Sequence, residues 1–171
     1  VSKPTILKDM DSIETRLKKY QIELDRRPGL GFSLKGCESR FRLAIEEIFL
    51  ETIGEISLLS LYQGEHKSFF EKINIENPLF ALLPFTLDSL HLSFCGSLVE
   101  RIEGLLGYSF SDSSHVSLGL FLAILVSRNK IGRKIEPLPK KKLLKVDSKI
   151  IEVAKKITDE INQQFNLEMP D

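Results

Sequence analysis

Apolar positions recur with helical spacing over the first twenty residues of the chain. Four of them follow one another at steps of four, three and four, which places them on one face of a helix that ends near Tyr20. These residues are Ile6, Met10, Ile13 and Leu17. Ser2 is a good N-cap for this helix, and Pro4 suits the first turn because the backbone N–H groups there have no helical partner.

The pattern then changes to the two-residue period of a strand. Apolar and polar residues alternate on both sides of the turn sequence Pro-Gly-Leu-Gly at 28–31. The segment 22–36 is therefore predicted to be a β-hairpin, with Arg26 and Arg27 at its tip.

From Glu38 onward the spacing is helical over most of the chain. One helix is predicted to run for about five turns from Glu38, and three more are predicted near 87–106, 113–130 and 146–165. The expected fold is mainly α, with a small helix-and-hairpin unit followed by an all-helical bundle.

These patterns predict three regions, with a boundary near Gly36. Residues 1–36 form the helix–hairpin unit, residues 37–86 a helical linker region, and residues 87–171 a helical domain. The chain starts without Met and enters a helix at once, so we expect it to be a piece of a longer protein.

Composition and charge narrow the classes of protein. The 171 residues are 42% hydrophobic and 28% charged with zero formal net charge, which is ordinary for a globular protein. Lys and Arg outnumber Asp and Glu by four over residues 1–42 and by six over 129–149. Either segment could face a polyanion, although a solvated lysine-rich loop is the commoner meaning of such a run.

Cysteine usage and hydropathy favour a cytoplasmic protein. Cys37 and Cys95 match no metal-ligand spacing, so we expect reduced thiols and no disulfide. The apolar run 116–126 is shorter than the roughly 20 residues of a membrane span, so we expect no membrane segment.

The sequence also argues against an enzyme. It contains no Gly-rich phosphate loop and no nucleophile elbow, and the Gly-Leu-Gly at 29–31 belongs to a hairpin turn. His66 and His91 have no partners at metal-ligand spacing, and we expect them to be structural or solvated. We therefore expect no catalytic activity, no cofactor and no bound metal.

A short basic helix followed by a hairpin with arginines at its tip is an arrangement that can bind DNA. The helix can enter the major groove while the hairpin, or wing, touches the flanking backbone. The other interpretation is a generic α/β cap with solvated charges.

The first 42 residues resemble the end of the winged helix-turn-helix of multidomain bacterial sugar-operon regulators. That group includes the mannitol and lichenan activators, and the Mga-like virulence regulators are related to it. The family pattern is V-S-x-x-T-I and x-x-D, then I-x-L-x-x-x-x-G-x-G-[FY]-x-L-x-G, then a Glu and an Arg. The residues that fit it are Val1, Ser2, Thr5, Ile6, Asp9, Ile22, Leu24, Gly29, Gly31, Phe32, Leu34, Gly36, Glu38 and Arg42.

This resemblance implies a set of DNA contacts. Its helix residues are Ser2, Lys3, Thr5 and Lys8, and its wing residues are Arg26 and Arg27. Ser2 and Thr5 could instead serve only as capping groups. Pro4 departs from the family, where a basic residue is common. The first two helices of the motif are not in this sequence, so we expect this chain to bind DNA weakly.

The later part of the chain resembles a phosphotransferase regulation domain, or PRD, an all-helical bundle. The resemblance is carried by SLVERIEGLLGYSFSDSSHVSLGLFLAILVSRNKIGRKIEPL, and it implies that the last helix of the bundle is missing. Such domains sense sugar supply through phosphorylation of histidines by the phosphocarrier protein or by sugar-transport subunits. In the family, one such histidine lies seven residues before an arginine. That position here, counted from Arg128, is Phe121, which has no nitrogen to accept a phosphoryl group.

His115 is a poor substitute for that histidine. It lies six positions earlier, about 9 Å along the helix axis and about 120° around it, so it does not share the face of Phe121 and Arg128. We expect His115 to be a polar residue in the first turn of its helix, near Asp112, and we expect no phosphorylation site within this chain.

The resemblance leaves three functional readings open. The first is a DNA-binding regulator of a carbohydrate operon, which acts as a homodimer and is controlled by phosphotransferase components. The second is a Mga-like regulator whose PRD serves mainly dimerisation without phosphorylation, which Phe121 favours. The third and weakest is an RNA-binding antiterminator, because those proteins carry a small β module in place of a winged helix.

Overall fold

The computed structural model describes residues 3–27, 29, 31–53, 91–136 and 146–169 of the chain. Its elements are α1 (Lys3–Lys19), β1 (Glu23–Arg27), β2 (Gly31–Lys35), α2 (Glu38–Ile53), α6 (Leu92–Leu106), α7 (Asp112–Lys130) and α9 (Ser148–Phe165). The prediction of a mainly α fold is confirmed, and the one sheet of the described residues is a two-stranded hairpin. The part of the predicted third helix before His91 lies outside the described residues.

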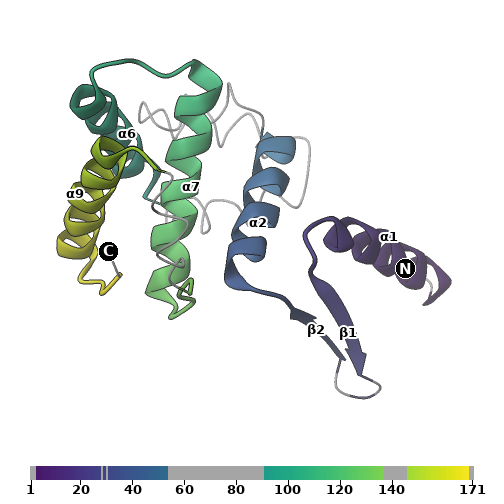
Figure 1. Cartoon of the computed structure of the whole chain (residues 1–171). Helices are drawn as coiled ribbons and strands as arrows, with labels where there is room; N and C mark the ends of the chain where they lie inside the picture. The colour runs from purple at the N-terminus through teal and green to yellow at the C-terminus, as the bar shows by residue number, and fades with distance from the viewer. Residues whose placement is uncertain (1–2, 28, 30, 54–90, 137–145, 170–171) are drawn as a thin grey trace.

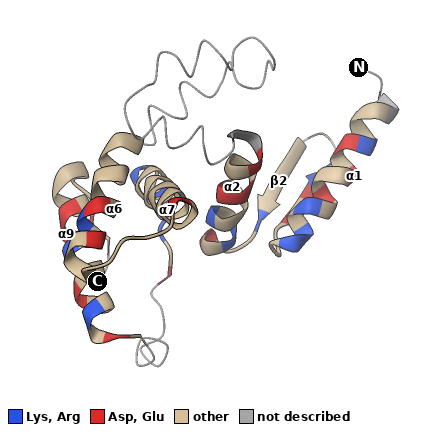
Figure 2. Cartoon of the chain, turned by 90° about the horizontal axis from the view of Figure 1, so that it is seen from above, with Lys and Arg blue, Asp and Glu red and all other residues tan. Residues whose placement is uncertain are grey.

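The elements follow one another across the molecule, with α7 between α2 and the pair formed by α6 and α9 (Figure 1). The hairpin and α1 lie beyond α2, at the far side from α9. Helix α7 packs against both α6 and α2. Charges of both signs are spread along α1, α2 and α9, whereas α7 carries them at its two ends (Figure 2).

The hairpin is antiparallel and short. Arg26 pairs with Phe32 and Arg27 with Gly31 across the ladder. Gly29 and Gly31 have φ values of 78° and 93°, a left-handed conformation that glycine adopts without a Cβ clash. Both glycines between β1 and the start of β2 thus adopt a backbone conformation that other residues rarely adopt.

A small apolar cluster joins α1, the hairpin and α2. Its buried members are Leu17, Tyr20, Ile22 and Ala44. The N–H of Ile22 donates to the carbonyl of Leu17 at 3.1 Å, which turns the chain from α1 into β1. The hydrogen bond and the apolar cluster hold α1 and the hairpin together as one unit.

The main core lies among α6, α7 and α9. Helix α7 is buried around most of its circumference, as the apolar run 116–126 predicts for the central helix of a bundle. Its N-cap is Ser111, whose side chain accepts from the N–H of Ser114, and Asp147 caps α9 by accepting from Lys149.

Helix α2 contacts both groups of apolar residues. Phe41 and Ala44 pack in the small cluster, whereas Ile45, Phe49 and Leu50 pack against the main core. The helix that starts after Gly36 therefore connects the helix–hairpin unit to the bundle by packing as well as by sequence.

Candidate functional site

The helix residues implied for DNA contact begin α1. Thr5 and Lys8 are exposed, and their spacing of three places them on one face of the helix. Lys3 is the first residue of α1, and Ser2 lies outside the described residues. Both side chains thus lie at the surface of α1.

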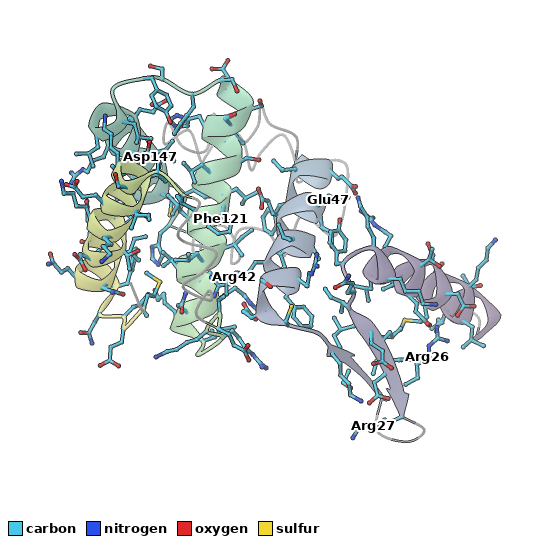
Figure 3. All side chains as sticks on the ribbon, in the orientation of Figure 1. Arg26, Arg27, Arg42, Glu47, Phe121 and Asp147 are labelled. Atoms are coloured by element: carbon cyan, nitrogen blue, oxygen red, sulfur yellow. The ribbon has the colours of Figure 1, made fainter. Side chains whose placement is uncertain are left out.

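The first wing arginine is already held by carboxylates of α1. Arg26 donates from Nη2 to Asp11 Oδ1 at 2.8 Å and to Glu14 Oε2 at 2.7 Å, and it reaches back toward the helix (Figure 3). The bonds from Lys18 and then Arg26 outweigh slight desolvation and hold the pKa of Glu14 below its usual value. Arg26 therefore braces the hairpin against α1.

The second wing arginine has a carboxylate partner on its own strand. Arg27 Nε lies 3.0 Å from Asp25 Oδ2, and Lys35 Nζ from β2 lies 2.9 Å from the same oxygen. Lys35 and then Arg27 lower the pKa of Asp25 below its usual value. Surface ion pairs of this kind contribute little to stability, so phosphate could replace the carboxylate at either arginine.

His115 lies in the first turn of α7 and is partly buried. Its Nδ1 is 3.6 Å from Glu103 Oε2 of α6, and Glu103 Oε1 accepts from the N–H of Phe110 at 2.6 Å. Sequence spacing places His115 near Asp112 but gives no sign of Glu103, because that contact joins two helices.

Phe121 is partly buried on α7 and borders an apolar cavity of about 630 Å³. The cavity lies chiefly between α7 and α9, and its lining includes Leu118, Leu122, Leu125, Val153 and Ile157. None of the described residues that line it is a histidine. The phenyl ring therefore contributes to the apolar wall of this cavity.

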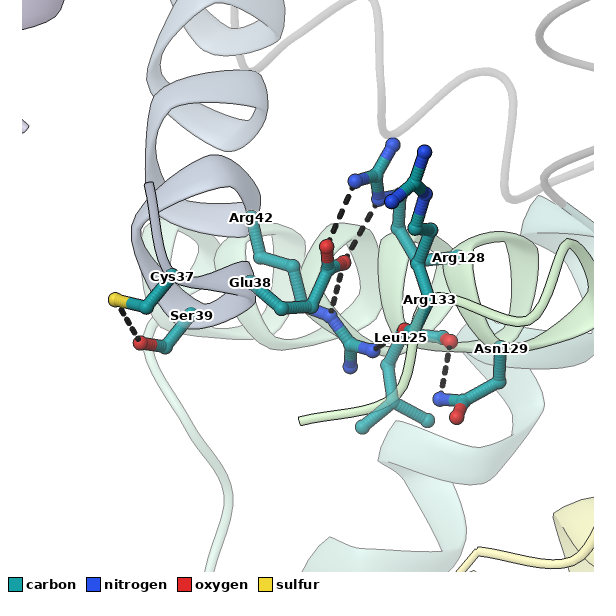
Figure 4. Close-up of polar contacts among 8 residues, drawn as sticks. All are labelled: Cys37, Glu38, Ser39, Arg42, Leu125, Arg128, Asn129 and Arg133. Carbon is teal, nitrogen blue, oxygen red and sulfur yellow. Dashed lines mark hydrogen bonds and ion pairs between the residues drawn. The ribbon is translucent and has the colours of Figure 1, made fainter. Parts of the chain in front are cut away.

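A two-pronged ion pair between residues far apart in the sequence joins α2 to α7. Arg128 binds both oxygens of Glu38, from Nε at 2.8 Å and from Nη2 at 2.7 Å (Figure 4). Arg42 donates from Nε to Glu38 Oε1 at 3.1 Å and from Nη2 to the carbonyl of Arg133 at 2.8 Å. We call Glu38, Arg42, Arg128 and Arg133 the junction cluster.

The junction cluster is shielded from water. The side chains of Glu38, Arg42 and Arg128 are 12%, 2% and 22% exposed. Burial alone would raise the pKa of Glu38, but the bonds from Arg128 and Arg42 outweigh it, and its pKa is below the usual value. A two-pronged charged contact in such surroundings is stronger than a surface pair.

Sequence reasoning missed the role of this cluster. Glu38 and Arg42 appear in the sequence only as part of a family pattern, and Arg128 only as the residue from which Phe121 is counted. The spacing of four between Glu38 and Arg42 is a usable local signal for a helical ion pair. The contact of Glu38 with Arg128 spans 90 positions and has no such signal.

A second polar contact joins the N-cap of α6 to the last residue of α7. His91 Nε2 is 3.0 Å from Lys130 Nζ, and the His91 ring lies 4.6 Å from the Phe165 ring. Burial and then Lys130 hold the pKa of His91 below its usual value. His91 is therefore a packed, neutral imidazole with a hydrogen-bond partner, and His66 lies outside the described residues.

The part of the chain that the structure describes holds one exposed thiol, Cys37, whose pKa is lowered by its hydrogen bond with Ser39, and one buried thiol, Cys95. No group of three or more His, Cys, Asp or Glu side chains lies close enough there to hold a metal ion. Burial raises the pKa of the Cys95 thiol to about 12. No described helix is long and apolar enough to cross a membrane.

Comparison with known families gives one match. A family model described as PRD domain matches residues 96–171, which include most of α6 and all of α7 and α9. No curated protein matches the chain. The match supports, in general terms, a family of PRD-containing regulators and antiterminators that respond to the phosphotransferase system.

Truncation of Leu120 and of its neighbour Phe121 to alanine should lower the free energy of unfolding by different amounts. Leu120 is fully buried, so Leu120→Ala is expected to lower the free energy of unfolding by about 2–5 kcal/mol. Phe121→Ala should cost less than the roughly 3–5 kcal/mol of a fully buried phenylalanine, because its ring is partly exposed beside a cavity. Urea denaturation of both variants measures the difference, and an equal or larger loss at Phe121 would contradict it.

The junction cluster should make stability depend on pH. The pKa of Glu38 is lower in the folded chain than its ordinary value of 4.5. Its ionised form therefore contributes stability that is fully present above that value and is lost as pH falls through the folded-state pKa. At pH 7, Glu38→Gln is expected to cost roughly 3 kcal/mol, the lower end for a broken buried pair.

Denaturant titrations at several pH values test this expectation. The difference between wild type and Glu38→Gln should shrink as the pH is lowered below 4.5. Glu152→Gln, which breaks the exposed Lys156–Glu152 pair, is the control and should change stability little. A pH-independent cost of Glu38→Gln would show that the charge of Glu38 is not what stabilises the junction.

Proposed function

We propose that this chain is part of a cytoplasmic DNA-binding transcriptional regulator of a carbohydrate operon that is controlled by the phosphotransferase system. The single observation that carries the proposal is the PRD match over residues 96–171. In this proposal the helix–hairpin unit, residues 1–36, is the second half of a winged helix-turn-helix. Residues 37–86 connect it to the regulatory domain at 87–171.

The geometry of the helix–hairpin unit supports the DNA part of the proposal. Thr5 and Lys8 face solvent on one side of α1, and the hairpin is held beside that helix by Arg26. Ser2, Lys3, Thr5 and Lys8 would meet the major groove, and Arg26 and Arg27 would meet the flanking phosphates. The carboxylates that now hold the two arginines would compete with phosphate and weaken the wing contacts.

A specific observation favours a second function for the regulatory domain. Phe121 lies on an apolar cavity wall in place of a phosphoacceptor histidine. A PRD without that histidine suits a regulator of the Mga-like kind, in which the domain serves mainly homodimerisation. Phosphocarrier or sugar-transport subunits would then act on other parts of the protein.

DNA binding by the chain should be weak and strongly dependent on salt. Neutralising one lysine that contacts phosphate is expected to reduce the slope of log K against log salt by about 0.9. Lys8→Gln should show this reduction when a labelled duplex is titrated by fluorescence anisotropy at several salt concentrations. Lys155→Gln, a change at an exposed lysine of α9 outside both basic segments, is the matched control. The proposal fails if the two variants reduce the slope equally.

Phosphoryl transfer tests the reading of Phe121. The chain is incubated with a phosphocarrier protein, its upstream kinase and labelled phosphoenolpyruvate. We expect no label on the wild type, because the described PRD residues offer no imidazole at the cavity. Phe121→His should take up label, and His115→Gln in that background should keep it. Label on the wild-type chain would contradict a domain that serves mainly dimerisation. It would favour a domain that is controlled by phosphorylation.

A further inference from the structure

The junction cluster lies where the two apolar groups of the molecule meet. Phe41 packs in the small cluster beside Ile22 and Leu17, and the guanidinium carbon of Arg128 lies 5.8 Å from the Phe41 ring centre. Arg128 therefore contacts α2 in two ways, through its charge on Glu38 and over the ring of Phe41. One side chain of α7 thus reaches the packing that fixes the helix–hairpin unit.

The same cluster holds the end of α7. The N–H groups of Gly132 and Arg133 donate to the carbonyls of Asn129 and Arg128, both at 2.9 Å, and Gly132 has a φ of 77°. This closes the C-terminal turn of the helix. Arg42 then donates to the carbonyl of Arg133, so α2 fixes the turn from outside (Figure 4).

The charges suit the two helix ends that meet here. Glu38 lies in the first turn of α2, where a negative charge is favourable, and Arg128 lies in the last turn of α7, where a positive charge is favourable. Two guanidinium groups share the one Glu38 carboxylate. Loss of Glu38 would leave the two positive charges of Arg42 and Arg128 close together in a shielded place.

We propose that the Glu38 carboxylate couples the two parts of the molecule: rearrangement of the C-terminal turn of α7 changes the packing of the helix–hairpin unit on α2, and the reverse. The coupling itself follows from the contacts of Arg128 and Arg42 with both helices. Its meaning as control of DNA contact rests on the proposed function.

Binding of a partner near Phe121 would affect this coupling, because Phe121 and Arg128 belong to the same helix. Phe121 and Arg128 are seven residues apart, so they lie on nearly the same side of α7 at about 10.5 Å along its axis. A dimer contact or ligand at the Phe121 cavity would therefore act on the same face of α7 that binds Glu38.

Amide hydrogen exchange on the 171-residue chain tests the coupling. The amides of Gly132 and Arg133 report the α7 turn, and the amide of Ile22 reports the helix–hairpin unit. Glu38→Gln should speed exchange at both places by about tenfold or more, and by a larger factor than it speeds exchange of the α9 amides. Glu152→Gln, which breaks an exposed pair on α9, should leave both places unchanged.

Two results would overturn the proposal. Acceleration confined to Gly132 and Arg133 would make Glu38 a local cap, and equal acceleration throughout α9 would make the effect a general loss of stability. Arg128→Lys keeps the charge and loses the two-pronged contact, so it provides a milder variant if Glu38→Gln folds poorly. It should accelerate both reporters by a smaller factor, and an unchanged Ile22 amide would count against coupling.

Adding DNA separates this proposal from the proposed function. If DNA binds the helix–hairpin unit, it should slow exchange at Gly132 and Arg133 in the wild type and not in Glu38→Gln, because coupling between sites is reciprocal. Absence of DNA binding would defeat the proposed function and leave the exchange result standing. DNA binding without any effect on the α7 turn would defeat the coupling.

Discussion

The structure depends on one carboxylate that serves two arginines. Glu38 is the first residue of α2, and its partners come from the next turn of the same helix and from the end of α7. Burying charges is costly unless each is paired, so the three side chains are stable only together. That requirement fixes the start of α2 against the end of α7, and the apolar residues of α2 then pack in both directions.

Local structure could be read from the sequence because its causes are local. The spacing of Ile6, Met10 and Ile13 predicts α1, and the glycines of the turn predict the hairpin, since both depend on residues within a few positions of one another. The helices after Glu38 follow the same rule and begin and end within a few residues of their predicted limits where the structure describes them. The division of the chain into regions 1–36, 37–86 and 87–171 stays a prediction. Helix α2, which follows the first boundary, packs against both the helix–hairpin unit and the helical bundle.

The candidate site was less predictable, because its contacts join residues far apart in sequence. Arg26 could be placed at the hairpin tip, but its carboxylate partners on α1 could not be anticipated from position alone. His115 is in its predicted turn, yet Glu103 comes from another helix. The junction cluster is the clearest case. The spacing of four between Glu38 and Arg42 is visible in the sequence, whereas nothing in the sequence pattern indicates the contact of Glu38 with Arg128.

The surroundings of Phe121 suit an apolar side chain. The cavity beside Phe121 is lined mostly by apolar side chains. A phenyl ring there adds apolar surface that an apolar partner can cover, and a phosphorylated imidazole would bring nearly two negative charges into the same place. Within the described residues, the chemistry of this face therefore favours control by packing, transmitted along α7 to Arg128, over control by charge at position 121.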